Sequence, residues 1–84
     1  MHYVYILHSE TDKKFYIGFS SDLKTRIIAH QKGEVKSTKK RRPLKLVYYE
    51  AFIDKRAARR QEFFYKTGQG RRVLKNRLNF VDKK

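Results

Sequence analysis

Five polar side chains stand out because their types and their order along the chain could support phosphodiester hydrolysis. They are Tyr5, Tyr16, Arg26, His30 and Glu62. This reaction needs a base to activate water, a cation to stabilise the charge that builds on phosphorus, and usually a divalent metal ion. Tyrosine or histidine can move the proton, arginine can bind two phosphate oxygens, and a single carboxylate can hold Mg²⁺. The residue types therefore suit a metal-dependent phosphodiesterase.

A hairpin is expected to bring the two tyrosines together. Residues 2–8 and 14–19 are rich in aromatic and β-branched side chains, which favour strands, and polar residues between them favour a turn. If the turn takes residues 9–12, Tyr5 lies opposite Tyr16, and both rings project from the same face of the hairpin. A different register would change this pairing.

A helix predicted over residues 22–32 carries Arg26 and His30, and Gly33 ends it. At about 100° per residue, both polar side chains fall on the same stripe as the apolar residues of this helix. Polar groups on an inward-facing stripe need a reason, and a functional site would supply one.

The remaining segments complete an α+β fold. The pattern predicts a strand followed by two helices, and glycines separate the helices: residues 44–52, 55–67 and 71–79. The order is strand, strand, helix, strand, helix, helix, which indicates a small mixed or antiparallel sheet covered by helices. With 84 residues and no separable linker, the chain is expected to form one domain over residues 1–84.

Charge is the strongest feature of the composition. Lysine and arginine total 22 against 8 acidic residues, a net charge of +14. Such a positive field attracts polyanions, so nucleic acid is the expected partner. The residues expected to contact phosphates are a basic loop and two cations of the second predicted helix: Lys36, Lys39, Lys40, Arg41, Arg42, Arg59 and Lys66.

Composition also excludes several classes of protein. The chain has no cysteine, which rules out disulfides, thiolate metal sites and a cysteine nucleophile. No apolar run is long enough to cross a bilayer, and the N-terminus does not resemble a signal peptide. We therefore expect a cytoplasmic protein that does not act at a membrane.

Each candidate on the hairpin and the first helix also has a structural explanation. Tyr5 and Tyr16 could form an aromatic cross-strand pair in the core, worth about 0.5–1 kcal/mol. Arg26 could lay its alkyl stem along the apolar stripe while its charged head reaches water. His30 could be a half-buried histidine with satisfied hydrogen bonds.

Two further residues have competing explanations as well. Gly18, two residues after Tyr16, could leave room for a ligand close to the backbone, or it could mark a β-bulge. Glu62 could form ordinary helix ion pairs with Arg59 and Lys66, each worth about 0.3–0.5 kcal/mol. Each structural explanation is reasonable alone, but all of them must hold together for the set to be accidental.

The ordered set resembles the GIY-YIG nuclease domain family, and most closely its small stand-alone bacterial members. The resemblance spans nearly the whole chain and rests on Tyr3-Val4-Tyr5, Tyr16-Ile17-Gly18, Arg26, His30 and Glu62. The Tyr-Ile-Gly match is literal. The family's Gly-Ile-Tyr is replaced here by Tyr-Val-Tyr, which keeps the tyrosine.

This resemblance implies a fold, an activity and roles for the site residues. The implied fold is a three-stranded antiparallel sheet flanked by helices. The implied activity is cleavage of DNA with one divalent ion, Mg²⁺ or Mn²⁺. By analogy Glu62 would bind the metal and Arg26 would stabilise the transition state. Tyr5 or Tyr16 would act as general base or position the water, and His30 would assist proton transfer.

A second function remains open from the sequence. The same fold could serve as a binding module for RNA or for structured or branched DNA without cutting it, since the altered first motif is compatible with lost activity. A partner protein could also select the substrate, because the chain carries no additional domain for that task.

Overall fold

A three-stranded antiparallel sheet organises the protein, whose computed structural model describes residues 1–78. The strand order is β2-β1-β3, so β2 and β3 are the edge strands. In chain order the elements are β1 (His2–Ser9), β2 (Phe15–Ser20), α1 (Leu23–Lys32), the short 3₁₀ helix η1 (Lys39–Arg41), β3 (Leu44–Phe52), α2 (Lys55–Tyr65) and α3 (Gly68–Arg77). The predicted α+β class, the antiparallel sheet and the order of strands and helices are confirmed.

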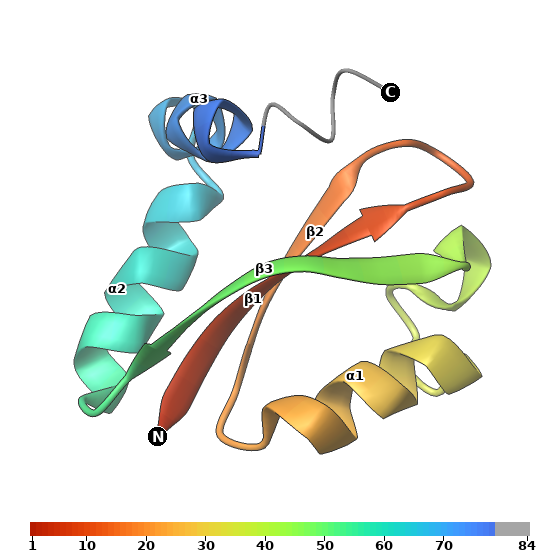
Figure 1. Ribbon diagram of the computed structural model, residues 1–84, viewed down its shortest axis with the longest axis horizontal. Helices are drawn as coiled ribbons and strands as arrows, with labels where there is room; N and C mark the ends of the chain where they lie inside the picture. The colour runs from red at the N-terminus through yellow and green to blue at the C-terminus, as the bar shows by residue number, and fades with distance from the viewer. Residues whose placement is uncertain (79–84) are drawn as a thin grey trace.

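Helices cover both faces of the sheet (Figure 1). On one face α2 and α3 close the larger core, which contains Val4, Ile6, Ile17, Ala58, Tyr65, Leu74 and Leu78. On the other face α1 covers a smaller cluster built on Tyr5, Leu7 and Leu44. Successive side chains of β1 point to opposite faces of the sheet, so this central strand contributes residues to both cores. None of the helices within residues 1–78 is both long and apolar enough to span a membrane.

The register of the β1–β2 hairpin differs from the predicted one. Tyr5 pairs with Gly18 and not with Tyr16. The turn starts one residue later than expected, because the Ser9 N–H donates to the carbonyl oxygen of Lys14 at 3.0 Å and extends the ladder. The resulting shift is two residues, which changes the partners but keeps both tyrosines on one face.

Helix α3 begins earlier than predicted. The sequence placed its glycines between two helices, but α3 starts at Gly68. Thr67 is the N-cap, and its Oγ1 accepts a hydrogen bond from the Gly70 N–H at 3.0 Å. Helix α2 accordingly ends at Tyr65, two residues before its predicted end. The last residue of the predicted helix 71–79 lies outside the described part of the chain.

A polar cluster joins β3 to α2 and α3. The Glu50 carboxylate accepts hydrogen bonds from Tyr48 Oη at 2.6 Å, Tyr65 Oη at 2.8 Å and Gln61 Nε2 at 3.1 Å. Arg77 Nη1 lies 3.4 Å from the same carboxylate. Burial and the adjacent carboxylate raise the pKa of Tyr65, so its phenol stays protonated and keeps donating.

Candidate active site

The candidate site is built around Tyr5, which the central strand β1 places against the edge strand β2. The Tyr5 ring lies over Gly18, where a Cβ atom would overlap the end of that ring. Glycine is needed here because it lets the ring pass close to the backbone. The expectation that Gly18 leaves room for a ligand is therefore wrong, because the Tyr5 side chain fills that space.

A buried chain of hydrogen bonds extends from Tyr5. Its Oη lies 2.8 Å from Nε2 of His30, and Nδ1 of His30 lies 2.7 Å from Oγ1 of Thr38. The exposed fractions of these three residues are 1%, 0% and 0%. Thr38 was not predicted as a site residue. The sequence gives little signal for it, because it lies in a polar, basic loop that looks exposed.

Tyr16 lies beside this chain and is half-buried. Its ring centroid is 6.4 Å from that of Tyr5 and 5.1 Å from the imidazole of His30. Three aromatic rings therefore meet at one point, although Tyr16 is not the cross-strand partner of Tyr5. Tyr5 and Tyr16 therefore form an aromatic contact beside His30, and this contact is compatible with both a structural and a functional role.

Arg26 and His30 lie one turn apart on α1, as predicted, but only His30 is buried. Arg26 is exposed, whereas His30 is fully buried. The Arg26 guanidinium still affects the buried hydrogen bonds. Its positive charge, together with the burial of Tyr5 and His30, shifts the pKa values of these two residues.

The pKa values of the buried pair follow from these surroundings. Burial raises the pKa of Tyr5, Arg26 opposes that rise, and the nearby Tyr16 and Glu62 add to it. Burial, with the positive charge of Arg26, lowers the pKa of His30 to about 4. At neutral pH both groups are therefore uncharged, and one ring nitrogen of His30 carries no proton.

Glu62 lies on α2, which covers the other face of the sheet. Its negative charge is the smallest of the contributions that raise the pKa of Tyr5. The two carboxylate oxygens lie 3.2 Å from Arg59 Nη1 and 3.1 Å from Lys66 Nζ. These are the helix ion pairs expected from spacing alone. Helix α2 packs against β2, where Arg59 lies 4.1 Å from the centroid of the Phe19 ring.

The donor set suits a hard divalent ion bound by few protein ligands. Within residues 1–78 no group of three or more His, Cys, Asp or Glu side chains could hold a metal. Mg²⁺ is often bound by one or two carboxylates, with waters and substrate phosphates completing its shell. Glu62, with a side chain 14% exposed, fits that mode as a single carboxylate.

Two cations of the basic loop are engaged within the protein. Arg41 Nε lies 2.6 Å from Asp12 Oδ2, and this guanidinium lowers the pKa of Asp12 to about 2. Arg42 Nε donates to the carbonyl oxygen of Lys39 at 3.0 Å. The loop cations Lys36, Lys39 and Lys40 are exposed. Of the predicted phosphate-binding residues, Arg59 and Lys66 lie at the candidate site.

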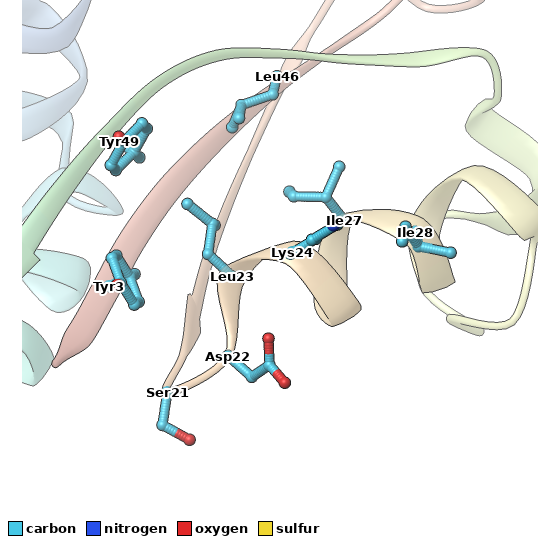
Figure 2. A pocket seen from close by; sticks show the side chains of 9 residues that line it. All are labelled: Tyr3, Ser21, Asp22, Leu23, Lys24, Ile27, Ile28, Leu46 and Tyr49. Carbon is cyan, nitrogen blue, oxygen red and sulfur yellow. The ribbon is translucent and has the colours of Figure 1, made fainter.

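An apolar groove lies on the other flank of α1. Figure 2 shows Leu23 and Ile27 of α1 facing Leu46 of β3, with the rings of Tyr3 and Tyr49 beyond them. The two tyrosine ring centroids are 6.1 Å apart. None of the five predicted catalytic residues lines this groove, so it is separate from the candidate site.

The buried His30 predicts a loss of stability in mild acid. The unfolded chain takes up a proton on this histidine near pH 6.5, whereas the folded protein does so only near pH 4. Stability is therefore complete above the unfolded pKa and falls as the pH drops towards 4. From pH 7 to pH 5 we expect the free energy of unfolding to fall by about 2 kcal/mol.

Urea unfolding at pH 7, 6 and 5 measures this loss, and the His30→Gln variant is the control. Because glutamine does not titrate, the loss between pH 7 and pH 5 should shrink by about 2 kcal/mol in the variant. An equal loss in both proteins would show that His30 does not cause it.

Comparison with known proteins gives consistent relatives. The chain is 42% identical to a UPF0213 protein of Bacillus pumilus over 79% of this chain and 67% of that protein. It is 41% identical to a UPF0213 protein of Staphylococcus saprophyticus over 88% of this chain and 90% of that protein.

A solved structure and a family match agree with these relatives. The solution NMR structure of a UPF0213 protein from Bacillus halodurans is similar, with a TM-score of 0.56 and 37% identity over 87% of this chain and 80% of that one. Residues 1–79 match the GIY-YIG catalytic domain, a family whose members are usually nucleases. The resemblance seen in the motifs is thus confirmed, and the chain belongs to the GIY-YIG catalytic domain family.

Proposed function

We propose that the protein is a metal-dependent endonuclease that hydrolyses phosphodiester bonds in DNA. The observation that carries this proposal is the buried hydrogen bond between Tyr5 and a neutral His30. The charges of Arg26 and Glu62 act on the pKa of the same Tyr5 phenol, and the four residues come from β1, α1 and α2. The membership of a family of catalytic domains supports the same conclusion.

Proton transfer is assigned to Tyr5 and His30. In one tautomer the Tyr5 hydroxyl donates to Nε2 of His30, while the Nδ1–H donates to Thr38 Oγ1. A phenol with such an acceptor behind it can take a proton from water while passing its own proton to the imidazole. Tyr16, which is more exposed than Tyr5, would orient that water.

Arg26 and Glu62 are assigned to phosphate binding and metal binding. The exposed guanidinium of Arg26 can bind two phosphate oxygens and stabilise the charge that develops on them. Glu62 would hold one Mg²⁺ or Mn²⁺, which would supply Lewis-acid stabilisation of the phosphate. Arg59 and Lys66, now paired with Glu62, would be free to contact neighbouring phosphates once the carboxylate binds the ion.

A second function, a nucleic-acid-binding module that does not cut, is favoured by one observation. Both oxygens of Glu62 are already engaged by Arg59 and Lys66. A carboxylate held in this way can be an ordinary helix ion-pair residue. The charge of +14 suits RNA or branched DNA as well as duplex DNA.

The dependence on divalent ions separates the two functions. Labelled single-stranded, duplex, flap and branched DNA are incubated with the protein in Mg²⁺, Mn²⁺ or chelator, beside a Glu62→Gln variant that exposes contaminating nuclease. We expect cleavage with either ion, no product with chelator and none from the variant. Binding of every substrate without cleavage of any would overturn the nuclease and leave the binding module.

A further inference from the structure

A second basic region lies away from the residues already discussed. A cavity of about 710 Å³ opens between the β1–β2 turn and α3. Six of its lining residues are cationic: Lys13, Lys14, Arg41, Arg71, Arg72 and Lys75. We call this the basic cavity. Its apolar wall is formed by β2 and α3, through Phe15, Ile17 and Leu74.

Most of the positive charge in the basic cavity is not neutralised. Asp12 is the only acidic residue that lines it, and Arg41 already pairs with that carboxylate at 2.6 Å. Lys13 pairs with Glu10, which lies outside the cavity lining, at 3.5 Å. Among residues 1–78, no acidic side chain forms an ion pair with the other four cations: Lys14, Arg71, Arg72 and Lys75. Gathering like charges in this way is unfavourable unless an anion binds between them.

The basic cavity shares the edge strand with the candidate active site. Phe15 and Ile17 alternate along β2 with Tyr16 and Gly18, so the cavity and the tyrosines lie on opposite faces of one strand. The cavity also shares its face with Arg59, which lies over Phe19. At about 3.3 Å per residue, this ring is about 13 Å from the cavity end of the strand.

On this face, cations therefore lie near both ends of β2, at Phe19 and at the basic cavity beside Phe15 and Ile17. Arg59 lies over the Phe19 ring, and Lys66 follows the end of α2, where it pairs with Glu62. Helix α3 then contributes Arg71, Arg72 and Lys75 to the basic cavity. A row of cations along one edge matches the row of charges on a nucleic-acid strand, and does not match a single small anion.

We propose that the basic cavity binds the phosphate backbone of the nucleic-acid substrate on one side of the bond that is cut. This inference rests on the proposed function and adds the path that the substrate takes. The cavity supplies affinity and position, and it takes no part in the chemistry. The contacts are to phosphates, so they carry no sequence preference.

A pair of charge-matched double variants tests the proposal. Arg71→Gln with Lys75→Gln removes two cavity cations one helical turn apart. Lys45→Gln with Arg56→Gln removes one lysine and one arginine that are exposed elsewhere, which gives the same net charge. Glutamine has a helix propensity similar to that of lysine and arginine, so both variants should fold. Lys14→Gln tests the opposite wall of the cavity, outside α3.

The readout is binding of a fluorescent DNA duplex in chelator, where no cleavage occurs, over a series of salt concentrations. In the cavity double variant we expect Kd to rise by about tenfold or more, and the slope of log K against log salt to fall by about 2. Lys14→Gln should lower that slope by about 1. Inorganic phosphate at the same phosphate concentration should not displace the duplex.

Equal losses in the two double variants would overturn the proposal, because affinity would then follow net charge and not the cavity. Displacement by inorganic phosphate would also overturn it, by showing a site for a small anion. Cleavage is scored separately, in a single turnover at saturating protein, so that a loss of binding is distinguished from a loss of chemistry. If the wild-type protein binds through the cavity but never cuts, the nuclease fails and the cavity stands.

Discussion

Replacing Glu62 with glutamine is expected to lower the rate of DNA cleavage by about 10³-fold or more. A bound divalent ion stabilises the transition state by several kcal/mol, and each 1.36 kcal/mol is a factor of ten in rate. Glutamine keeps the size of the side chain but is a poor ligand for Mg²⁺. Single-turnover cleavage at saturating protein measures the loss without interference from binding.

The fold and the affinity should survive this change. Arg59 and Lys66, the partners of Glu62, have side chains 57% and 49% exposed, and exposed helix pairs contribute only about 0.3–0.5 kcal/mol each. DNA affinity should stay equal or rise slightly, because a negative charge is removed. Glu34→Gln, at an exposed position, makes the same change of charge and should cut normally. Wild-type cleavage by Glu62→Gln would exclude this carboxylate as the metal ligand.

Replacing Gly70 with alanine is expected to destabilise the protein by about 3 kcal/mol or more. The new Cβ would overlap the carbonyl oxygen of Phe64 and crowd the backbone of Tyr65. A backbone group cannot move aside as a flexible side chain can, so α2 and α3 would have to separate. For a domain of this size the loss corresponds to about 12 °C or more in Tm.

The matched control lies two residues earlier in the same helical turn. A Cβ at Gly68 meets nothing within 4 Å, so Gly68→Ala should be neutral or raise stability by up to about 1 kcal/mol. Thermal unfolding of the two variants side by side separates crowding from helix propensity. Equal Tm values would show that the close approach of α3 to α2 does not limit stability.

The fold could be predicted largely because its elements are short and strongly patterned. The aromatic and β-branched runs indicated all three strands, and Gly33 marked the end of α1. The turn of the hairpin was placed one residue too early, since Ser9 is polar yet continues the ladder. Glycines that open α3 looked like a break, because their role depends on contact with α2.

The sequence predicted which residues belong to the candidate site but not which side chains contact one another. Tyr5, Tyr16 and Glu62 were recognised by type and order, but spacing does not show that the Tyr5 ring covers Gly18. Thr38 becomes a partner of His30 only after a loop folds back over α1. Glu50 likewise has partners on two elements that are distant in sequence, Gln61 and Tyr65 of α2 and Arg77 of α3. Such long-range pairs depend on tertiary packing, which local patterns do not encode.

The position of β2 at the edge of the sheet has a consequence for solubility. An edge strand presents unpaired backbone groups that can template pairing with another copy of the chain, and natural proteins discourage this with charge. Here Lys14 precedes β2 and Arg59 lies over Phe19 of that strand, so two copies that approach edge to edge repel each other. The charges proposed to recruit nucleic acid thus also oppose aggregation, and a variant stripped of them to weaken binding loses that protection.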